Sequence, residues 1–319
     1  MSIGSVEICA GAGGQALGLE QAGFDHVSLV EIEAPACQTL RMNRPHWNVV
    51  EGDLRHYSVD KWKCVALLAG GVPCPPFSKA GKQLGNDDER DLFPEAIRLV
   101  NECMPDAVML ENVRGILDKV FDDYRANIVQ DLKKLGYVAD WRLLNASDYG
   151  VPQLRPRVVL VALRENRAQH FSWPTPSSVA AQTVGESLFD LMASNGWRGA
   201  KSWRERAATI APTLVGGSKK HGGPDLGPTR AKKAWAAIGV DGMGIANEVP
   251  SQDFVGMPRL TVRMAARIQG FPDSWLFSGK KTAAYRQIGN AFPPPVACAV
   301  GAQILAALIS AAKPKLMRA

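Results

Sequence analysis

Short apolar runs alternate with stretches of helical apolar spacing along the first half of the chain. Short apolar runs are typical of buried strands, and apolar positions three or four residues apart are typical of helices that bury one face. The predicted strands span residues 6–9, 27–30, 47–50, 65–68, 107–110, 138–143 and 158–163. The predicted helices span residues 16–22, 35–42, 92–103 and 121–135. This alternation predicts an α/β fold with a doubly wound, mostly parallel sheet.

The alternation stops after Phe171, and the chain as far as Met257 is rich in Gly, Pro, Ser and Lys. Helical spacing returns at residues 261–269 and again at 295–312, where it predicts an amphipathic closing helix. We therefore expect a first domain of residues 1–170, a smaller loop-rich insert of residues 171–257, and a segment of residues 258–319 that returns to the first domain. Disorder is the alternative for the insert, but its tryptophans favour a packed core: Trp173, Trp197, Trp203 and Trp235.

The composition is that of an ordinary globular protein. The chain has 319 residues, of which 46% are hydrophobic and 21% charged. Its apolar runs are expected to be too short for a membrane span, and no basic segment followed by an apolar one begins the chain, so we expect a cytoplasmic protein. The cysteines are dispersed and form no C-x-x-C pair, so neither a disulfide scaffold nor a metal site is expected: Cys9, Cys37, Cys64, Cys74, Cys103 and Cys298.

Positive charge is concentrated in one stretch of the insert. The chain carries a formal net charge of +6, and the stretch from Arg198 to Trp235 has nine Lys and Arg residues against two acids, a net charge of +7. The remainder of the chain is therefore close to neutral. A solvated surface segment is one explanation for such a cluster, but concentration of the whole excess in one Gly- and Pro-rich region favours a polyanionic partner.

A single thiol, Cys74, follows the apolar run of residues 65–69 in the sequence Gly-Gly-Val-Pro-Cys-Pro-Pro-Phe-Ser. Loops at strand ends carry chemistry in α/β proteins because the sheet holds the root of the loop while its tip stays accessible. Prolines on both sides stiffen the backbone around the cysteine. The loop therefore marks Cys74 as a candidate reactive residue, whereas the other cysteines are expected to be small buried side chains.

A glycine loop and two acids indicate a nucleotide-type site. Gly11, Gly13 and Gly14 lie between a predicted strand and a predicted helix, where glycines permit a tight turn and close approach of a ligand to the backbone. Glu31 ends one strand, as an acid that binds ribose hydroxyls does, and Asp53 follows another, where it could accept a bond from an adenine amino group. A plain turn and capping acids are the alternatives. No P-loop is present, so a nucleoside without a triphosphate fits better.

Two further groups of charged residues lie beside predicted strands. Glu111, in Glu-Asn-Val, has apolar residues before it, and we expect it to hold a proton more readily than an exposed carboxylate does. A salt-bridged Glu111 is the alternative. Arg155 and Arg157 alternate in an extended segment, which places both side chains on one side for contact with an anion or with the carbonyl of a base. Unpaired surface arginines are the alternative there.

Together these blocks resemble those of DNA (cytosine-5)-methyltransferases. The blocks of that family occur in order: Gly-Val-Pro-Cys-Pro-Pro-Phe-Ser, Glu-Asn-Val, Gln-Leu-Arg-Pro-Arg, Arg-Leu-Thr-Val-Arg with Ala-Arg-Ile-Gln-Gly-Phe-Pro, and Gln-Ile-Gly-Asn-Ala. The resemblance covers residues 6–163 and about 259–305. It implies a Rossmann-like methyltransferase fold in which the insert is a target-recognition domain.

The resemblance also implies roles for individual residues. Cys74 would be the nucleophile that adds to C6 of a flipped cytosine, Glu111 would hold N3 and the exocyclic amine, and Arg157, with Arg155 nearby, would contact the base or position Cys74. The implied cofactor is S-adenosylmethionine, bound by Cys9, Ala10, Gly11, Gly13, Gly14, Glu31, Ile32, Asp53, Leu54, Gly71, Pro73, Asn290 and Ala291. The residues expected to contact DNA are Ser78, Lys79, Arg206, Thr213, Leu214, Lys219 and Lys220.

The implied partner is double-stranded DNA at a short site, with a monomeric enzyme that stands alone or is paired with a cognate restriction endonuclease. Two positions depart from the family pattern: Cys9 replaces an aromatic that would stack on the cofactor's adenine, and Met264 follows Arg263 where a glutamate is usual. We expect the second position to be structural. Two rival interpretations are a tRNA cytosine methyltransferase on the same fold and a catalytically silent DNA-binding regulator. The basic insert favours DNA over tRNA, and retention of Cys74, Glu111 and Arg157 argues against the regulator.

Overall fold

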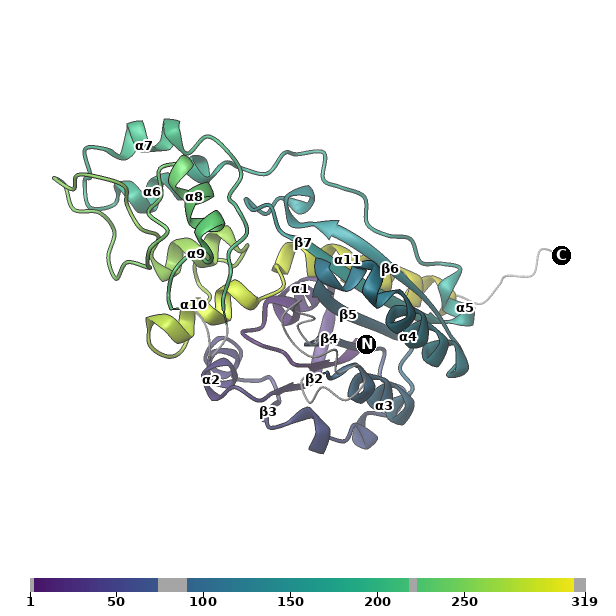
Figure 1. Ribbon diagram of the computed structural model, residues 1–319. Coiled ribbons are helices and arrows are strands. Elements are labelled where there is room, and N and C mark those ends of the chain that lie inside the picture. The colour runs from purple at the N-terminus through teal and green to yellow at the C-terminus, as the bar shows by residue number, and fades with distance from the viewer. Residues whose placement is uncertain (1–2, 74–90, 218–222, 313–319) are drawn as a thin grey trace.

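The computed structural model describes residues 3–73, 91–217 and 223–312. A seven-stranded sheet in the order β3-β2-β1-β4-β5-β7-β6 forms its centre (Figure 1). Only β7 runs antiparallel to its neighbours, so the predicted doubly wound, mostly parallel sheet is confirmed. The strands are β1 (Ile3–Ile8), β2 (Phe24–Glu31), β3 (Val49–Glu51), β4 (Leu67–Gly71), β5 (Ala107–Val113), β6 (Tyr137–Asn145) and β7 (Pro156–Arg164).

Two of these strands continue further than the apolar runs predict. β4 includes Gly70 and Gly71, which pair with Leu110 and Glu111 of β5. A Cβ on Gly70 would lie 2.5 Å from the carbonyl oxygen of Ile8, so β4 can pass this close to β1 only with a glycine. The expected loop therefore begins two residues later, and Glu111 belongs to β5 instead of following it.

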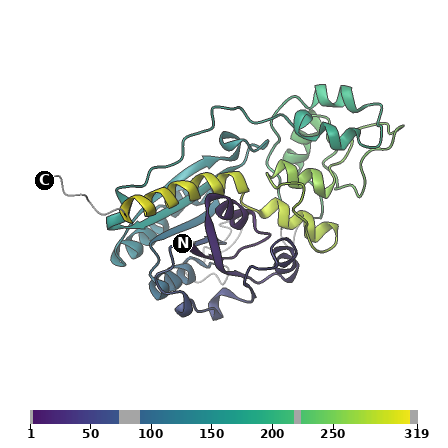
Figure 2. The ribbon, with the colours of Figure 1, turned by 180° about the vertical axis from the view of Figure 1, so that it is seen from behind.

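Helices cover both faces of the sheet. On one face the buried side chains of α3 and α4 pack against residues such as Val108 and Leu110, and on the other face α1 and α11 pack against residues such as Met109. Figure 2 shows α11 lying along the sheet. The helices of this part are α1 (Gly14–Ala22), α2 (Ala34–Asn43), α3 (Phe93–Cys103), α4 (Asp122–Lys134), α5 (Glu165–Ala168) and α11 (Pro294–Ala312). Short 3-10 helices span Leu54–His56, Asp60–Trp62, Arg114–Leu117, Lys119–Phe121 and Ala146–Tyr149.

The closing helix is more apolar than expected. Within the described residues, the stretch Lys281–Ala311, which includes all of α11 but its last residue, is long and apolar enough to cross a membrane. The expectation that all apolar runs are too short for a membrane span was therefore wrong. Of the most apolar 18 residues in this stretch, 56% are buried inside the molecule. Helix α11 packs on the sheet and on α1. These contacts are those of a core helix.

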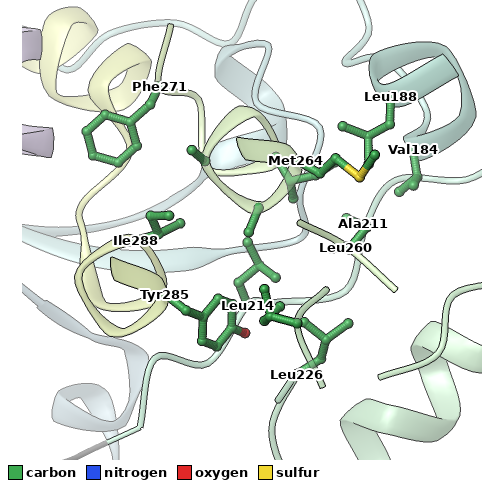
Figure 3. Packing of buried hydrophobic residues seen from close by; sticks show 14 of the residues in the cluster. Val184, Leu188, Ala211, Leu214, Leu226, Leu260, Met264, Phe271, Tyr285 and Ile288 are labelled. Atoms are coloured by element: carbon green, nitrogen blue, oxygen red, sulfur yellow. The ribbon is translucent and has the colours of Figure 1, made fainter. Parts of the chain in front are cut away.

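A second group of helices packs at one side of the sheet, and the described residues of this group form no strand of their own (Figure 1). Trp197, Trp203 and Trp235 are all buried in its core, so a packed insert is confirmed over disorder for the described residues. Figure 3 shows part of this core, in which Val184 and Leu188 lie near Met264. The helices are α6 (Val184–Ala193), α7 (Ala200–Arg206), α8 (Thr229–Ala237), α9 (Val262–Ile268) and α10 (Lys281–Asn290).

The methionine that departs from the family pattern caps a helix. Thr261 precedes α9, and its hydroxyl accepts a hydrogen bond from the backbone N–H of Met264. The sulfur of Met264 lies 3.5 Å from the backbone nitrogen of Thr261 and accepts its hydrogen bond, as the glutamate of a capping box does. Met264 is fully buried. Its environment is therefore that of a core residue, as expected from the sequence.

Candidate active site

A cavity of about 660 Å³ opens beyond the carboxyl ends of β1, β2, β4 and β5. This edge of an open α/β sheet is where ligands bind, and the volume lies in the range of small-molecule sites. Twelve of the thirteen residues predicted to hold a cofactor line the cavity, together with Glu111 and Arg157. The twelve are Cys9, Ala10, Gly11, Gly14, Glu31, Ile32, Asp53, Leu54, Gly71, Pro73, Asn290 and Ala291.

The glycine loop turns sharply between β1 and α1. Cys9, Gly11 and Gly13 all have positive φ angles, of 50°, 54° and 82°. Gly13, the one predicted cofactor residue outside the cavity lining, is the N-cap of α1, and a Cβ there would lie 2.7 Å from Leu40. Glycine is needed at Gly13 for both its conformation and its packing. The loop leaves the amino end of α1 directed at the cavity.

Glu31 holds this loop in place. One carboxylate oxygen accepts a hydrogen bond from the backbone N–H of Gly11 at 2.7 Å, and the other accepts one from Glu33 at 2.8 Å. Burial nevertheless raises the pKa of Glu31 above its ordinary value. Each oxygen still has a second lone pair, so the carboxylate can accept a further hydrogen bond from a ligand hydroxyl.

Asp53 acts as a cap at the rim of the same cavity. Its carboxylate accepts a hydrogen bond from the backbone N–H of Arg55 at 3.0 Å and pairs with the Arg55 guanidinium at 3.2 Å. Asp53 therefore caps a short helix, which was the alternative to ligand binding in the sequence analysis. Because Asp53 also lines the cavity, this cap holds the carboxylate where a ligand would meet it.

Glu111 and Arg157 form a buried ion pair. Arg157 Nε lies 2.8 Å from Glu111 Oε1, and only about a tenth of each side chain is exposed. Burial raises the pKa of Glu111 although Arg157 opposes this shift, and burial lowers the pKa of Arg157. Both sequence interpretations of Glu111 hold, since it is salt-bridged and also takes up a proton more readily than an exposed carboxylate.

The root of the cysteine loop ends beside this pair. A Cβ on Gly71 would lie 3.4 Å from Glu111 Oε2, and Asn112 donates a side-chain hydrogen bond to the carbonyl of Val72 at 2.8 Å. Pro73, the last described residue before Cys74, lines the cavity. Cys74, Ser78 and Lys79 lie outside the described residues, as do Lys219 and Lys220.

Arg155 has a different environment from Arg157. Its side chain is fully buried, does not line the cavity, and donates hydrogen bonds to the carbonyl oxygens of Leu214 at 2.7 Å and Gly289 at 2.6 Å. Alternation in sequence therefore does not bring the two guanidinium groups to one target. Arg155 joins segments of the chain that lie 59 and 134 residues away.

Three predicted DNA contacts lie in the described part of the chain. Arg206 is exposed, and its guanidinium donates to the carbonyl of Ala236 at 3.0 Å. The hydroxyl of Thr213 donates to the carbonyl of Leu154. Leu214 is 1% exposed and packs in the helical core, so we assign its side chain to packing instead of to DNA contact.

Two cavity residues, Glu7 and Gln15, were given no role from the sequence. Glu7 on β1 is 1% exposed, and burial raises its pKa well above the ordinary value even though the backbone N–H of Ala16 favours the carboxylate. Gln15 on α1 is 4% exposed, and neither polar atom of its side chain has a hydrogen-bond partner among the described residues. The sequence signal that could have identified Glu7 is an acidic residue within the apolar run of a predicted strand.

Replacement Glu7→Gln is expected to stabilise the protein at alkaline pH. The folded pKa of Glu7 lies above its unfolded value, so the folded state binds more protons between these values and the free energy of unfolding falls as the pH rises through that interval. Glutamine does not titrate, so the variant is expected to gain on the order of 1 kcal/mol in free energy of unfolding at pH 8. This gain becomes smaller toward pH 4. Thermal unfolding at both pH values measures the difference. Glu205→Gln, at an exposed glutamate, is the control for the substitution itself, and equal destabilisation by Glu7→Gln at both pH values would contradict the expectation.

Comparisons with known proteins found a matching family and similar relatives. Residues 3–306 match the sequence profile of a family described as C-5 cytosine-specific DNA methylase. The type II methyltransferase M.NgoMIV of Neisseria gonorrhoeae is 61% identical over 311 residues, which cover 97% of this chain and 99% of the relative. The type II methyltransferase M.NaeI of Lentzea aerocolonigenes is 59% identical over 313 residues, which cover 96% of this chain and 76% of the relative.

Solved structures share the fold. One, described as a DNA modification methyltransferase encoded within an Escherichia coli prophage, matches with a TM-score of 0.69 at 22% identity and covers 97% of this chain and 100% of that one. Another, DNMT2 of Spodoptera frugiperda, matches with a TM-score of 0.61 at 19% identity and covers 97% of this chain and 99% of its own. At these identities the likeness concerns the fold alone.

Proposed function

Because this chain belongs to the C-5 cytosine-specific DNA methylase family, we propose that it methylates C5 of a flipped cytosine in a short duplex site. It is a DNA (cytosine-5)-methyltransferase of the type II restriction–modification kind. S-adenosylmethionine is the proposed methyl donor, and Cys74 is the proposed covalent nucleophile. The observation that carries the proposal is the shared cavity. The buried Glu111–Arg157 pair, the root of the Cys74 loop and the glycine loop all border one space, so a base and a cofactor can meet there.

The residues of the cavity suit S-adenosylmethionine. Glu31 and Asp53 offer carboxylate oxygens at the ends of neighbouring strands, and the glycine loop offers the amino end of α1. Cys9 supplies no ring for adenine stacking, so the apolar side chains of Ile32 and Leu54 at the same cavity are proposed to take that contact. When bound, the cofactor supplies an electrophilic methyl group.

The chain's own residues perform the remaining chemistry in this proposal. Cys74 adds as the thiolate to C6 of the cytosine, which forms a C–S bond and raises the electron density at C5. Glu111 hydrogen-bonds N3 and the exocyclic amine and stabilises the charge that develops on the ring, while Arg157 holds Glu111 in place. After C5 has gained the methyl group, its proton leaves to a base and the C–S bond breaks, which releases Cys74.

The remaining parts of the chain have supporting roles in this proposal. Residues 171–257 form the target-recognition domain, in which the basic stretch from Arg198 to Trp235 binds phosphates and makes DNA affinity depend strongly on salt. Arg155 is a positioning residue, since its guanidinium bonds to backbone carbonyls. We further propose a cytoplasmic monomer that acts on the same site as a cognate restriction endonuclease or stands alone.

A methyl-transfer assay with two substrates tests the proposed function. Purified protein with S-adenosylmethionine labelled at its methyl group is expected to label duplex DNA and not tRNA, because the family that the chain matches is described as a DNA methylase. Bisulfite sequencing of DNA from cells that express the protein then identifies the methylated cytosine and its flanking bases. Label in tRNA alone would overturn the DNA assignment, and DNA binding without label would indicate a regulator.

A further inference from the structure

The recognition domain reaches the cofactor cavity through residues 213–217. There the chain crosses the carboxyl end of α10 so closely that neither side of the crossing has room for a side chain. A Cβ on Gly216 would lie 2.4 Å from Asn290 Oδ1 and 2.7 Å from the carbonyl of Arg286, and a Cβ on Gly289 would lie 2.4 Å from the backbone nitrogen of Gly216. Neither glycine has a positive φ, so lack of space is the reason for glycine at both positions.

Buried hydrogen bonds fix this crossing. Arg155 donates from the same guanidinium to Leu214 on one side of the crossing and to Gly289 on the other, at 2.7 and 2.6 Å. The side-chain oxygen of Gln153 accepts a hydrogen bond from the backbone N–H of Leu214 at 2.8 Å. Figure 3 shows the side chain of Leu214 beside Tyr285, with Ile288 near both in the same core. Residues 213–217 and α10 are therefore held together as one unit.

This crossing places a residue of the recognition domain in the wall of the cavity. Gly217 lines the cavity together with Asn290, which was predicted to hold the cofactor, and Asn290 Nδ2 donates a hydrogen bond to the carbonyl of Gly217 at 3.3 Å. Asn290 thus contacts the recognition domain and also lines the cavity. A shift of residues 213–217 must displace the side chain that Asn290 presents to a ligand.

We propose that residues 213–217 complete the cofactor site, and that Gly216 is a positioning residue which keeps Asn290 and Gly217 in the cavity wall. This inference rests on the proposed function, since it takes the cavity as the S-adenosylmethionine site.

Gly216→Ala tests the proposal without DNA and without catalysis. Alanine suits the backbone conformation, so its effect comes from the contact with Asn290 and Arg286. We expect the Kd for S-adenosylhomocysteine, measured by titration calorimetry, to rise about tenfold or more, and in the methylation assay the KM for S-adenosylmethionine to rise far more than kcat falls. Gly223→Ala is the matched control, because a Cβ there meets no atom of the described residues within 4 Å; it should leave the Kd unchanged.

Two further measurements keep the test independent of folding. If Gly216→Ala does not show a cooperative thermal transition, Gly289→Ala perturbs the same crossing from α10 and is expected to weaken binding in the same way. In the wild-type protein, S-adenosylhomocysteine is expected to slow amide hydrogen exchange at residues 214–217. Failure of the wild type to bind S-adenosylhomocysteine would refute the proposed function. A wild type that binds, with unchanged exchange at 214–217 and an unchanged Kd in the crossing variants, would overturn this inference alone.

Discussion

Cys74→Ser is expected to lower methyl transfer by on the order of 10⁴-fold or more while it leaves the Kd for S-adenosylhomocysteine within about twofold. A serine hydroxyl is protonated at neutral pH and is a much weaker nucleophile than a thiolate, so the C–S adduct that activates C5 cannot form. Single-turnover transfer to duplex DNA measures the rate, and calorimetry measures the Kd. Residual transfer above about a hundredth of the wild-type rate would contradict a covalent role for Cys74.

The control for this variant is Cys64→Ser. Cys64 is an exposed free thiol that precedes the amino end of β4, whereas the cavity lies at the carboxyl end of that strand. Activity should therefore be unchanged. A duplex that contains 5-fluorocytosine gives a second measurement, because fluorine at C5 cannot leave as a proton and the adduct persists. The wild type and Cys64→Ser should form a denaturation-resistant protein–DNA adduct, and Cys74→Ser should form none.

Glu111→Gln is expected to lower the single-turnover rate about 10²- to 10³-fold, the usual effect of removing one group that stabilises developing charge. Glutamine keeps the shape but cannot supply a carboxyl group to N3, and it leaves the Arg157 guanidinium buried beside a neutral partner. The Kd for S-adenosylhomocysteine should change by less than about threefold if Glu111 serves the base and not the cofactor.

A double-mutant cycle separates the role of Glu111 in chemistry from its role in the ion pair. Breaking a buried pair is strongly destabilising because it leaves one charge uncompensated, by about 3–5 kcal/mol. Arg157→Met should therefore lower the thermal midpoint more than the double variant Glu111→Gln with Arg157→Met does. If the double variant regains stability but not rate, Glu111 acts in the reaction. Recovery of the rate together with stability would show that Glu111 is only structural.

The order of strands and helices could be read from the sequence because apolar periodicity reports which face of each element is buried. All seven predicted strands are present, and residues at the carboxyl ends of the parallel strands β1, β2, β4 and β5, such as Glu31, meet at one cavity. The ends of β4 and β5 were misjudged because backbone pairing, not side-chain hydrophobicity, carries those strands through Gly71 and Glu111. The closing apolar stretch is also longer than expected. Burial of α11 against the sheet explains why so many of its residues are apolar.

The sequence alone determined the fold class and predicted the reactive groups, because both depend on local patterns and on short motifs that follow predicted strands. It could not separate Arg155 from Arg157, since two residues of one type in one motif differ only in what the distant chain places beside them. Tertiary structure decided that Arg157 pairs with Glu111 and that Arg155 joins Leu214 to Gly289. It also decided that Gly217 of the insert lines the cavity, because the closeness of Gly216 and Gly289 is set by packing between segments that sequence periodicity does not encode.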